Sequence, residues 1–188
     1  MSALPSPSDI VAFWLAAGYE RWFTSDPAFD EEVRARLLPA YEDAVRRGAG
    51  ATPLPDYEAT PEGALALVLL LDQVPRNVFR GTPRAFTTDA AALQVTERAL
   101  ARGFDQLVEN KQLRSFLYLP FTHAEDLAHQ ERCVALYEQL GDEEELKYAH
   151  IHHDIIARFG RFPHRNPILG RDMKPEEQQY LSDGGFSG

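Results

Sequence analysis

Apolar residues recur at helical spacing along this chain, in segments that prolines and glycines separate. The first segment starts at Ser6-Pro7, a common helix start, and ends at Gly18, with apolar positions at Ile10, Phe13, Trp14 and Ala17. The strict alternation of apolar and polar residues that is typical of strands is nearly absent. The pattern therefore predicts an all-α fold.

A wholly apolar run, residues 64–71, lies before the middle of the sequence. A helix that is apolar on every side is normally buried, so we expect this one, which begins at Thr60-Pro61, to be the centre of the fold. Pro75 should end it, and Pro39 should kink an earlier helix. The remaining signals, including a capping box at 122–125, give about seven helices joined by short turns, which is typical of antiparallel helical hairpins.

The length and composition fit one soluble domain. The 188 residues are 44% hydrophobic, enough for a real core, and we predict a single helical domain over residues 1–188 with a frayed tail at 177–188. Cys133 is the only cysteine, the first residues lack a signal-peptide pattern, and no apolar run could span a bilayer. We therefore expect a cytoplasmic protein with no membrane contact. The net charge of −10 makes nucleic acid an improbable partner.

Two arginine-rich segments stand out against this acidic background. RFGRFPHRNPILGR, residues 158–171, contains four arginines and no acid, and DQVPRNVFRGTPRAF, residues 72–86, shares its Pro–Arg–Asn pattern. Arginine presents a planar fork of donors that suits carboxylate or phosphate. The candidate ligand-binding residues are Arg76, Asn77, Arg80, Arg161, His164, Arg165 and Asn166. The alternative is that these side chains only tie down irregular turns whose carbonyls lack helical partners.

Three further residues are candidates for proton transfer. Asp72 follows the apolar run and should be partly buried beside an arginine, either as part of an internal ion pair or as a general base. His152 points toward an apolar helix face, where burial should lower its pKa. His123 completes the catalytic candidates. Together with Glu125 and His129 these histidines could in principle hold a metal, but no zinc-type spacing is present and we predict no metal site. The cofactor is unknown.

Five segments carry a resemblance to the uncharacterised bacterial family named domain of unknown function 924. They are VAFWL, WFTSDPAFDEEVRAR, LLLDQVPRNVFRGTPRAF, FLYLPFTHAEDLAHQERCV and HHDIIARFGRFPHRNPILGR, in this order over nearly the whole chain. The resemblance implies an all-α, tetratricopeptide-like superhelix and brings no activity with it. This chain departs from the family pattern at Leu15, at Ala124, where a small hydroxyl residue is usual, and at Met173-Lys174. A serine nucleophile before Glu125 is therefore not expected.

Two functions from different classes remain open at this point. The first is a binding module whose Arg/His/Asn-lined site takes an anionic small molecule or an acidic peptide. The second is a small enzyme in which Asp72, His123 and His152 move protons while arginines stabilise negative charge. No nucleophile stands out, so we favour the binding module. The sequence decides neither whether the protein is an enzyme nor its oligomeric state.

Overall fold

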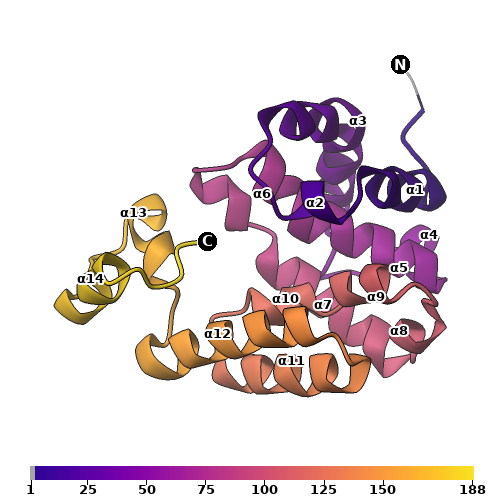
Figure 1. Ribbon diagram of the computed structural model, residues 1–188. Helices are drawn as coiled ribbons and strands as arrows, with labels where there is room; N and C mark the ends of the chain where they lie inside the picture. Colours follow the sequence, from indigo (N-terminus) through magenta and orange to yellow (C-terminus); the bar gives the residue numbers. More distant parts are fainter. Residues whose placement is uncertain (1–2) are drawn as a thin grey trace. The chain divides into compact units, whose positions relative to one another are not determined.

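The computed structural model describes residues 3–188, and these residues are all-α, as predicted (Figure 1). The α-helices are α1 (Pro7–Ala17), α2 (Tyr19–Trp22), α3 (Pro27–Arg46), α4 (Pro55–Glu58), α5 (Pro61–Val68), α6 (Val74–Val78), α7 (Asp89–Ala101), α8 (Phe104–Leu107), α9 (Lys111–Phe116), α10 (Leu119–Thr122), α11 (Leu127–Leu140), α12 (Glu143–Phe159), α13 (Asn166–Leu169) and α14 (Pro175–Ser182). A π-helix, η1 (Leu69–Gln73), and the 3₁₀ turns η2 (Pro83–Phe86) and η3 (Pro163–Arg165) complete them.

The prediction of about seven helices was wrong, because the described part of the chain carries many additional short helices. Several of them, among them α2, α4, α8 and α13, are single turns of four residues. A four-residue helix is too short for apolar periodicity to register in the sequence. The predicted start signals at Ser6 and Thr60 act as side-chain N-caps of α1 and α5, and Asp26 caps α3 in the same way.

The backbone forms two compact units. The first comprises the described residues up to Arg80 together with Arg84–Pro120, and the second comprises Gly81–Pro83 and Phe121–Gly188. Within the first unit α5 packs against α1, α4 and α7, and α3 packs against α6. Every side chain from Ala64 to Leu71 is at most 2% exposed, which confirms that the apolar run is buried. The single-domain assignment and the tetratricopeptide-like superhelix stay predictions.

Pro75 does not end the central helix, contrary to the sequence-based prediction. The chain continues through the π-helix η1 into α6, where Pro75 occupies the first turn. Proline has no N–H, so the carbonyl of Leu71, four residues earlier, lacks its helical donor. The buried hydroxyl of Thr88 donates to that carbonyl at 2.6 Å. Pro39 lies inside α3, and the kink expected there stays a prediction.

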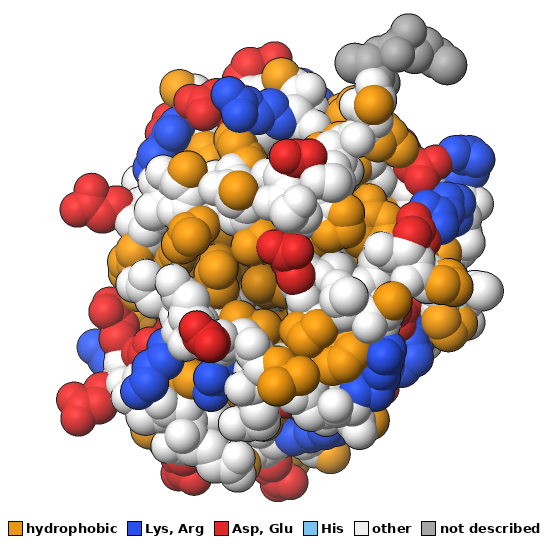
Figure 2. Space-filling view, turned by 90° about the vertical axis from the view of Figure 1, so that its right-hand side faces the viewer, with side chains coloured by type: hydrophobic (Ala, Val, Ile, Leu, Met, Phe, Trp, Pro, Cys, Tyr) orange, Lys and Arg blue, Asp and Glu red, His pale blue; other side chains and the backbone are white. Residues whose placement is uncertain are grey.

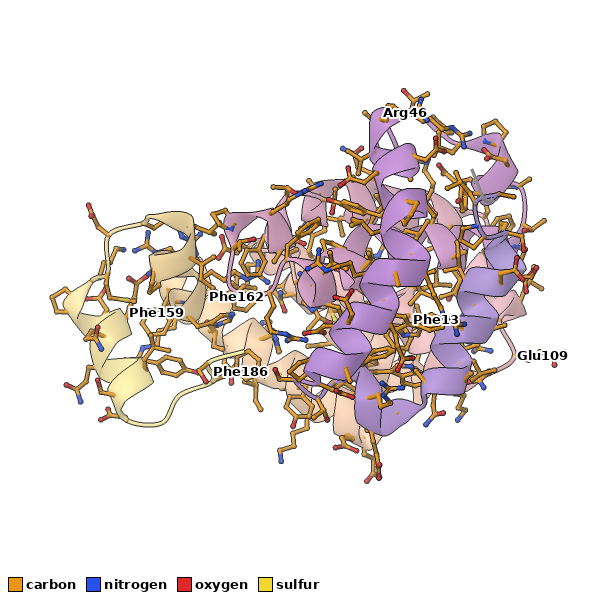
Figure 3. The ribbon with its side chains drawn as sticks, turned by 90° about the horizontal axis from the view of Figure 1, so that it is seen from above. Phe13, Arg46, Glu109, Phe159, Phe162 and Phe186 are labelled. Atoms are coloured by element: carbon orange, nitrogen blue, oxygen red, sulfur yellow. The ribbon has the colours of Figure 1, made fainter. Side chains whose placement is uncertain are left out.

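The second unit is built on an antiparallel hairpin of α11 and α12, joined at Gly141-Asp142 (Figure 1). Ile155 and Ile156 of α12 form its core with Phe162, and Phe159, Tyr180 and Phe186 pack against them. Figure 3 labels Phe159, Phe162 and Phe186 in this unit. The N-cap of α11 is Asp126, which accepts the N–H of His129, so the predicted capping box at 122–125 was wrong.

Part of the tail predicted to fray, residues 177–188, lies in helix α14. Helix α14 extends to Ser182, and Glu177 in its first turn is fully buried. Phe186 reaches the core of the second unit. The ion pair of Glu177 and the ring contacts of Phe186 oppose fraying, and the frayed tail stays a prediction.

The surface of the described residues carries isolated large apolar side chains, such as Leu15, Phe23 and Leu107 of the first unit. Figure 2 shows apolar side chains gathered near the middle of one face, with charged side chains of both signs around them. Among residues 3–188, no helix combines the length and the apolar character that crossing a bilayer requires.

Candidate functional site

The first arginine-rich segment is neutralised by acids of its own unit. Asp72, on the π-helix, is fully buried and accepts a hydrogen bond from Gln73 Nε2 at 2.5 Å. Arg76 Nη1 lies 3.5 Å from Asp72 Oδ1, and its guanidinium donates to both oxygens of Asp89 at 2.8 and 3.1 Å. Burial alone would lower the pKa of Arg76, but the charges of Asp72 and Asp89 outweigh it and raise that pKa. The arrangement is an internal ion-pair network.

Asn77 and Arg80 converge on a single acid, Asp30 of α3. Asn77 Nδ2 donates to Asp30 Oδ1 at 2.8 Å. Arg80 donates to both Asp30 oxygens, at 2.9 and 3.0 Å, and this hydrogen bonding raises the pKa of Arg80. These contacts fix α6 against α3. The three candidate ligand-binding residues of this segment are thus all engaged by carboxylates of the protein itself.

The second arginine-rich segment is organised around the buried carboxylate of Glu177. Arg161 donates to both of its oxygens, from Nε at 2.6 Å and from Nη2 at 2.8 Å. Asn166 Nδ2, at 3.0 Å, and the N–H of Lys174, at 2.8 Å, complete its shell. The hydrogen bond from Arg161 is the main cause that holds the pKa of Glu177 at about 2. Arg161 and Asn166, both predicted to bind a ligand, therefore bind Glu177.

A second acid, Glu125, holds the same segment from the other side. Its carboxylate accepts the N–H of Phe162 at 2.7 Å and both ends of the Arg171 fork at 2.6 and 3.0 Å. Burial would raise the pKa of Glu125, but the hydrogen bonds from Arg171 and Phe162 lower it. The assignment of Glu125 to a helix cap was therefore wrong. Sequence reasoning also left Arg171 out of the site, although it ends the same cationic segment.

The structure brings His123, His152, His164 and Arg165, the histidine–arginine cluster, together in the second unit. Arg165, 6% exposed, donates to the His123 carbonyl at 3.2 Å, and its guanidinium carbon lies 4.5 Å from the centre of the Phe162 ring. The ring of His152 packs edge-on against Phe162, with centroids 5.4 Å apart. His164 contacts the same phenylalanine at 5.7 Å.

Both packed histidines of this cluster are neutral at pH 7. Burial, followed by the charge of Arg165, lowers the pKa of His164 to about 4. Burial also lowers the pKa of His152 to about 4, as the sequence predicted, and nearby His123 and Arg165 add to the effect. The Nδ1 atom of His152 lies 2.8 Å from the Tyr148 carbonyl, so it carries the proton and leaves Nε2 as an acceptor. The Nδ1 atom of His164 is buried and has no hydrogen-bond partner within residues 3–188.

The three residues predicted to transfer protons do not belong to one unit. Asp72 is part of the first unit, whereas His123 and His152 are part of the second. His129, the remaining histidine weighed for metal binding, lies 3.2 Å from Asp126 at the start of α11. Within residues 3–188 no group of three or more His, Cys, Asp or Glu side chains could hold a metal ion.

Comparison with known proteins gives the chain a family without a function. The model of a family described as bacterial protein of unknown function (DUF924) matches residues 10–185, and the chain belongs to this family. A solved structure of a protein of unknown function from Agrobacterium tumefaciens is similar to it, with 47% sequence identity and a TM-score of 0.87 over 95% of this chain and 97% of that one. No curated protein matches the sequence.

Proposed function

We propose that this protein binds a small molecule with an anionic group at the histidine–arginine cluster of its second unit. The observation that carries the proposal is the buried, unpartnered Nδ1 of His164. A buried polar atom without a hydrogen bond costs free energy, and such atoms in a native structure are common where a ligand supplies the missing partner. An oxygen of the ligand would accept the Nδ1–H of the neutral imidazole.

The electrostatics of the cluster favour an anion over a cation. Arg165 follows His164 directly in the chain, and its positive charge contributes to the low pKa of both histidines. Burial is the first cause of the low pKa of His164, the charge of Arg165 is the second, and Glu125 acts in the opposite direction; the positive charge beside the ring favours an anion. Bound anion would raise the pKa of His164 again, so binding should take up protons and strengthen as the pH falls from 7 toward 5.

Ion pairs occupy three of the other arginines that the sequence predicted to bind a ligand, which leaves this cluster as the candidate site. Arg76, Arg80 and Arg161 each donate to both oxygens of an acid from their own unit. A ligand at those guanidiniums would have to displace a carboxylate that is already in place. We therefore assign these three arginines to holding the turns, and the buried, unpartnered Nδ1 of His164, whose next residue in the chain is Arg165, to the ligand.

The test is a calorimetric titration with inorganic phosphate and with acetate at pH 7 and pH 5.5. We expect phosphate to bind more tightly at the lower pH and to raise the melting temperature. Stabilisation of about 2.7 kcal/mol is expected at 100 times the dissociation constant. His164→Phe keeps an aromatic ring for packing but removes both nitrogens, and it should abolish binding. The control is His150→Ala, an exposed position on α12. The proposal fails if neither anion binds, or if His164→Phe binds as well as the wild type.

A small enzyme remains the second candidate, and the fixed tautomer of His152 favours it. A histidine whose Nδ1–H is held by a carbonyl presents Nε2 as a base, which is the arrangement of many catalytic histidines. Against this, general bases work best when their pKa lies near the working pH, and the pKa of His152 is about 4. We therefore place the binding module ahead of the enzyme. An anion that binds but is recovered chemically unchanged would agree with that order.

A further inference from the structure

The ring of Phe186 packs against two histidines of the histidine–arginine cluster, His152 and His164. Its centroid lies 4.6 Å from the centre of the His152 ring and 5.6 Å from that of His164, tilted by 59° and 77°. The same side chain packs against the apolar group of Ile155, Ile156 and Phe162. Figure 3 shows Phe186 and Phe162 in the same part of the second unit. The two histidines and this apolar group thus form a slot that fits one aromatic ring.

The segment that carries this ring is rich in glycine. Its sequence is Asp-Gly-Gly-Phe-Ser-Gly over residues 183–188. Four of its N–H groups donate to α14: that of Asp183 to the Gln179 carbonyl at 2.9 Å, that of Gly184 to the Leu181 carbonyl at 3.2 Å, that of Gly185 to the Tyr180 carbonyl at 3.0 Å, and that of Phe186 to the Tyr180 hydroxyl at 3.0 Å. Glycine loses more conformational freedom on ordering than any other residue, so three glycines in six positions make the docked state costly. The ring can therefore be exchanged for that of a ligand.

From these contacts we infer that the ligand is an aromatic anion, whose ring takes the slot of Phe186 while its negative group meets His164 and Arg165. The inference rests on the proposed function and adds the substrate class to it. The imidazole rings supply flat, neutral surfaces for an aromatic partner. Arg165, the next residue after His164, supplies a positive charge for the anionic group. An anion without a ring would not displace the Phe186 ring from the slot.

The experiment compares phenyl phosphate with inorganic phosphate in the wild type and in Phe186→Ala. The variant leaves the slot open, so we expect it to bind phenyl phosphate about tenfold more tightly than inorganic phosphate, the gain expected for burying a phenyl ring. In the wild type the preference should be smaller, because Phe186 competes. The matched control is Phe159→Ala. That ring packs in the same core, with its centroid 5.3 Å from that of Tyr180, but has no ring contact with a histidine among residues 3–188, so this variant should keep the wild-type ratio.

A second measurement uses the wild type alone and does not depend on how well the variant folds. Phenyl phosphate should speed hydrogen exchange of the Phe186 amide, which loses its bond to Tyr180 when the ring leaves, whereas inorganic phosphate should not change it. Equal affinities for the two anions in Phe186→Ala, with unchanged exchange in the wild type, would overturn the inference and leave anion binding standing. Absence of binding by either anion in either protein would overturn both.

Discussion

Replacement of Glu177 by glutamine tests whether the second arginine-rich segment is held together by its buried acid. The carboxylate accepts four hydrogen bonds, two from Arg161 and one each from Asn166 and the Lys174 N–H. Glutamine keeps the shape and one acceptor oxygen, but its NH₂ group faces donors where the second oxygen stood. About two of the four bonds are lost.

The expected cost follows from these contacts. A hydrogen bond to a charged group contributes about 1.5 kcal/mol, so two lost bonds correspond to about 3 kcal/mol. The Arg161 side chain is 23% exposed and recovers part of its hydration in the variant. We therefore expect Glu177→Gln to lower the free energy of unfolding by about 2 kcal/mol at pH 7. Glu176→Gln changes the same charge one residue earlier, at an exposed position, and should cost less than about 0.5 kcal/mol.

The difference in stability between the wild type and Glu177→Gln should depend on pH. Arg161 lowers the pKa of Glu177 from its usual 4.5 to about 2 in the folded protein. Its contribution is therefore complete above pH 4.5 and is lost as the pH falls from 4.5 toward 2. Because glutamine does not titrate, the difference between wild type and variant should shrink over the same interval.

The assay is urea-induced unfolding of both proteins between pH 7 and pH 3, with hydrogen exchange to locate the effect. The slowest amides of α12 and α14 should exchange faster in Glu177→Gln at pH 7, while those of α5 should change least. A destabilisation under about 0.5 kcal/mol, or one that stays constant down to pH 3, would refute the reasoning. Either result would mean that the ion pair with Arg161 contributes little and that packing alone holds α14.

Two further predictions concern other parts of the chain. Thr88→Val removes the hydroxyl that donates to the Leu71 carbonyl, so it should lower the free energy of unfolding in urea by about 1.5 kcal/mol. Thr87→Val, at an exposed site, should lower it little. Equal effects of the two changes would contradict the role given to Thr88. Burial raises the pKa of the Cys133 thiol to about 12, so this thiol should resist a disulfide reagent at pH 8 until the protein unfolds, and fast labelling of the native protein would show that the site opens.

Local signals in the sequence were sufficient where short-range physics decides the structure. The N-caps at Ser6 and Thr60 act within three residues of themselves, and the structure has them as predicted. The buried helix at residues 64–71 was equally predictable, because an all-apolar surface has no stable place in water. The low pKa of His152 followed from its position on an apolar face.

Prolines were harder to interpret, because their effect depends on what else lies nearby. Pro75 removes one donor, which in an isolated helix would favour ending the helix there. Here Thr88, thirteen residues further on, supplies the missing donor to Leu71, and the helix continues through a π-turn. The sequence around Pro75 does not indicate that a hydroxyl at the start of another helix donates to the Leu71 carbonyl.

The sequence by itself determined that this is an all-α chain, where α1 and α5 begin, and which two segments concentrate arginine. The tertiary structure decided what those arginines do. Glu125 and Glu177 lie 37 and 16 residues from the groups they bind, Phe162 and Arg161, and each looked like an ordinary acid at a helix start. Charge pairing over such separations is set by how helices pack. It is visible only once the fold shows which cations already have an acid and which histidines lie together.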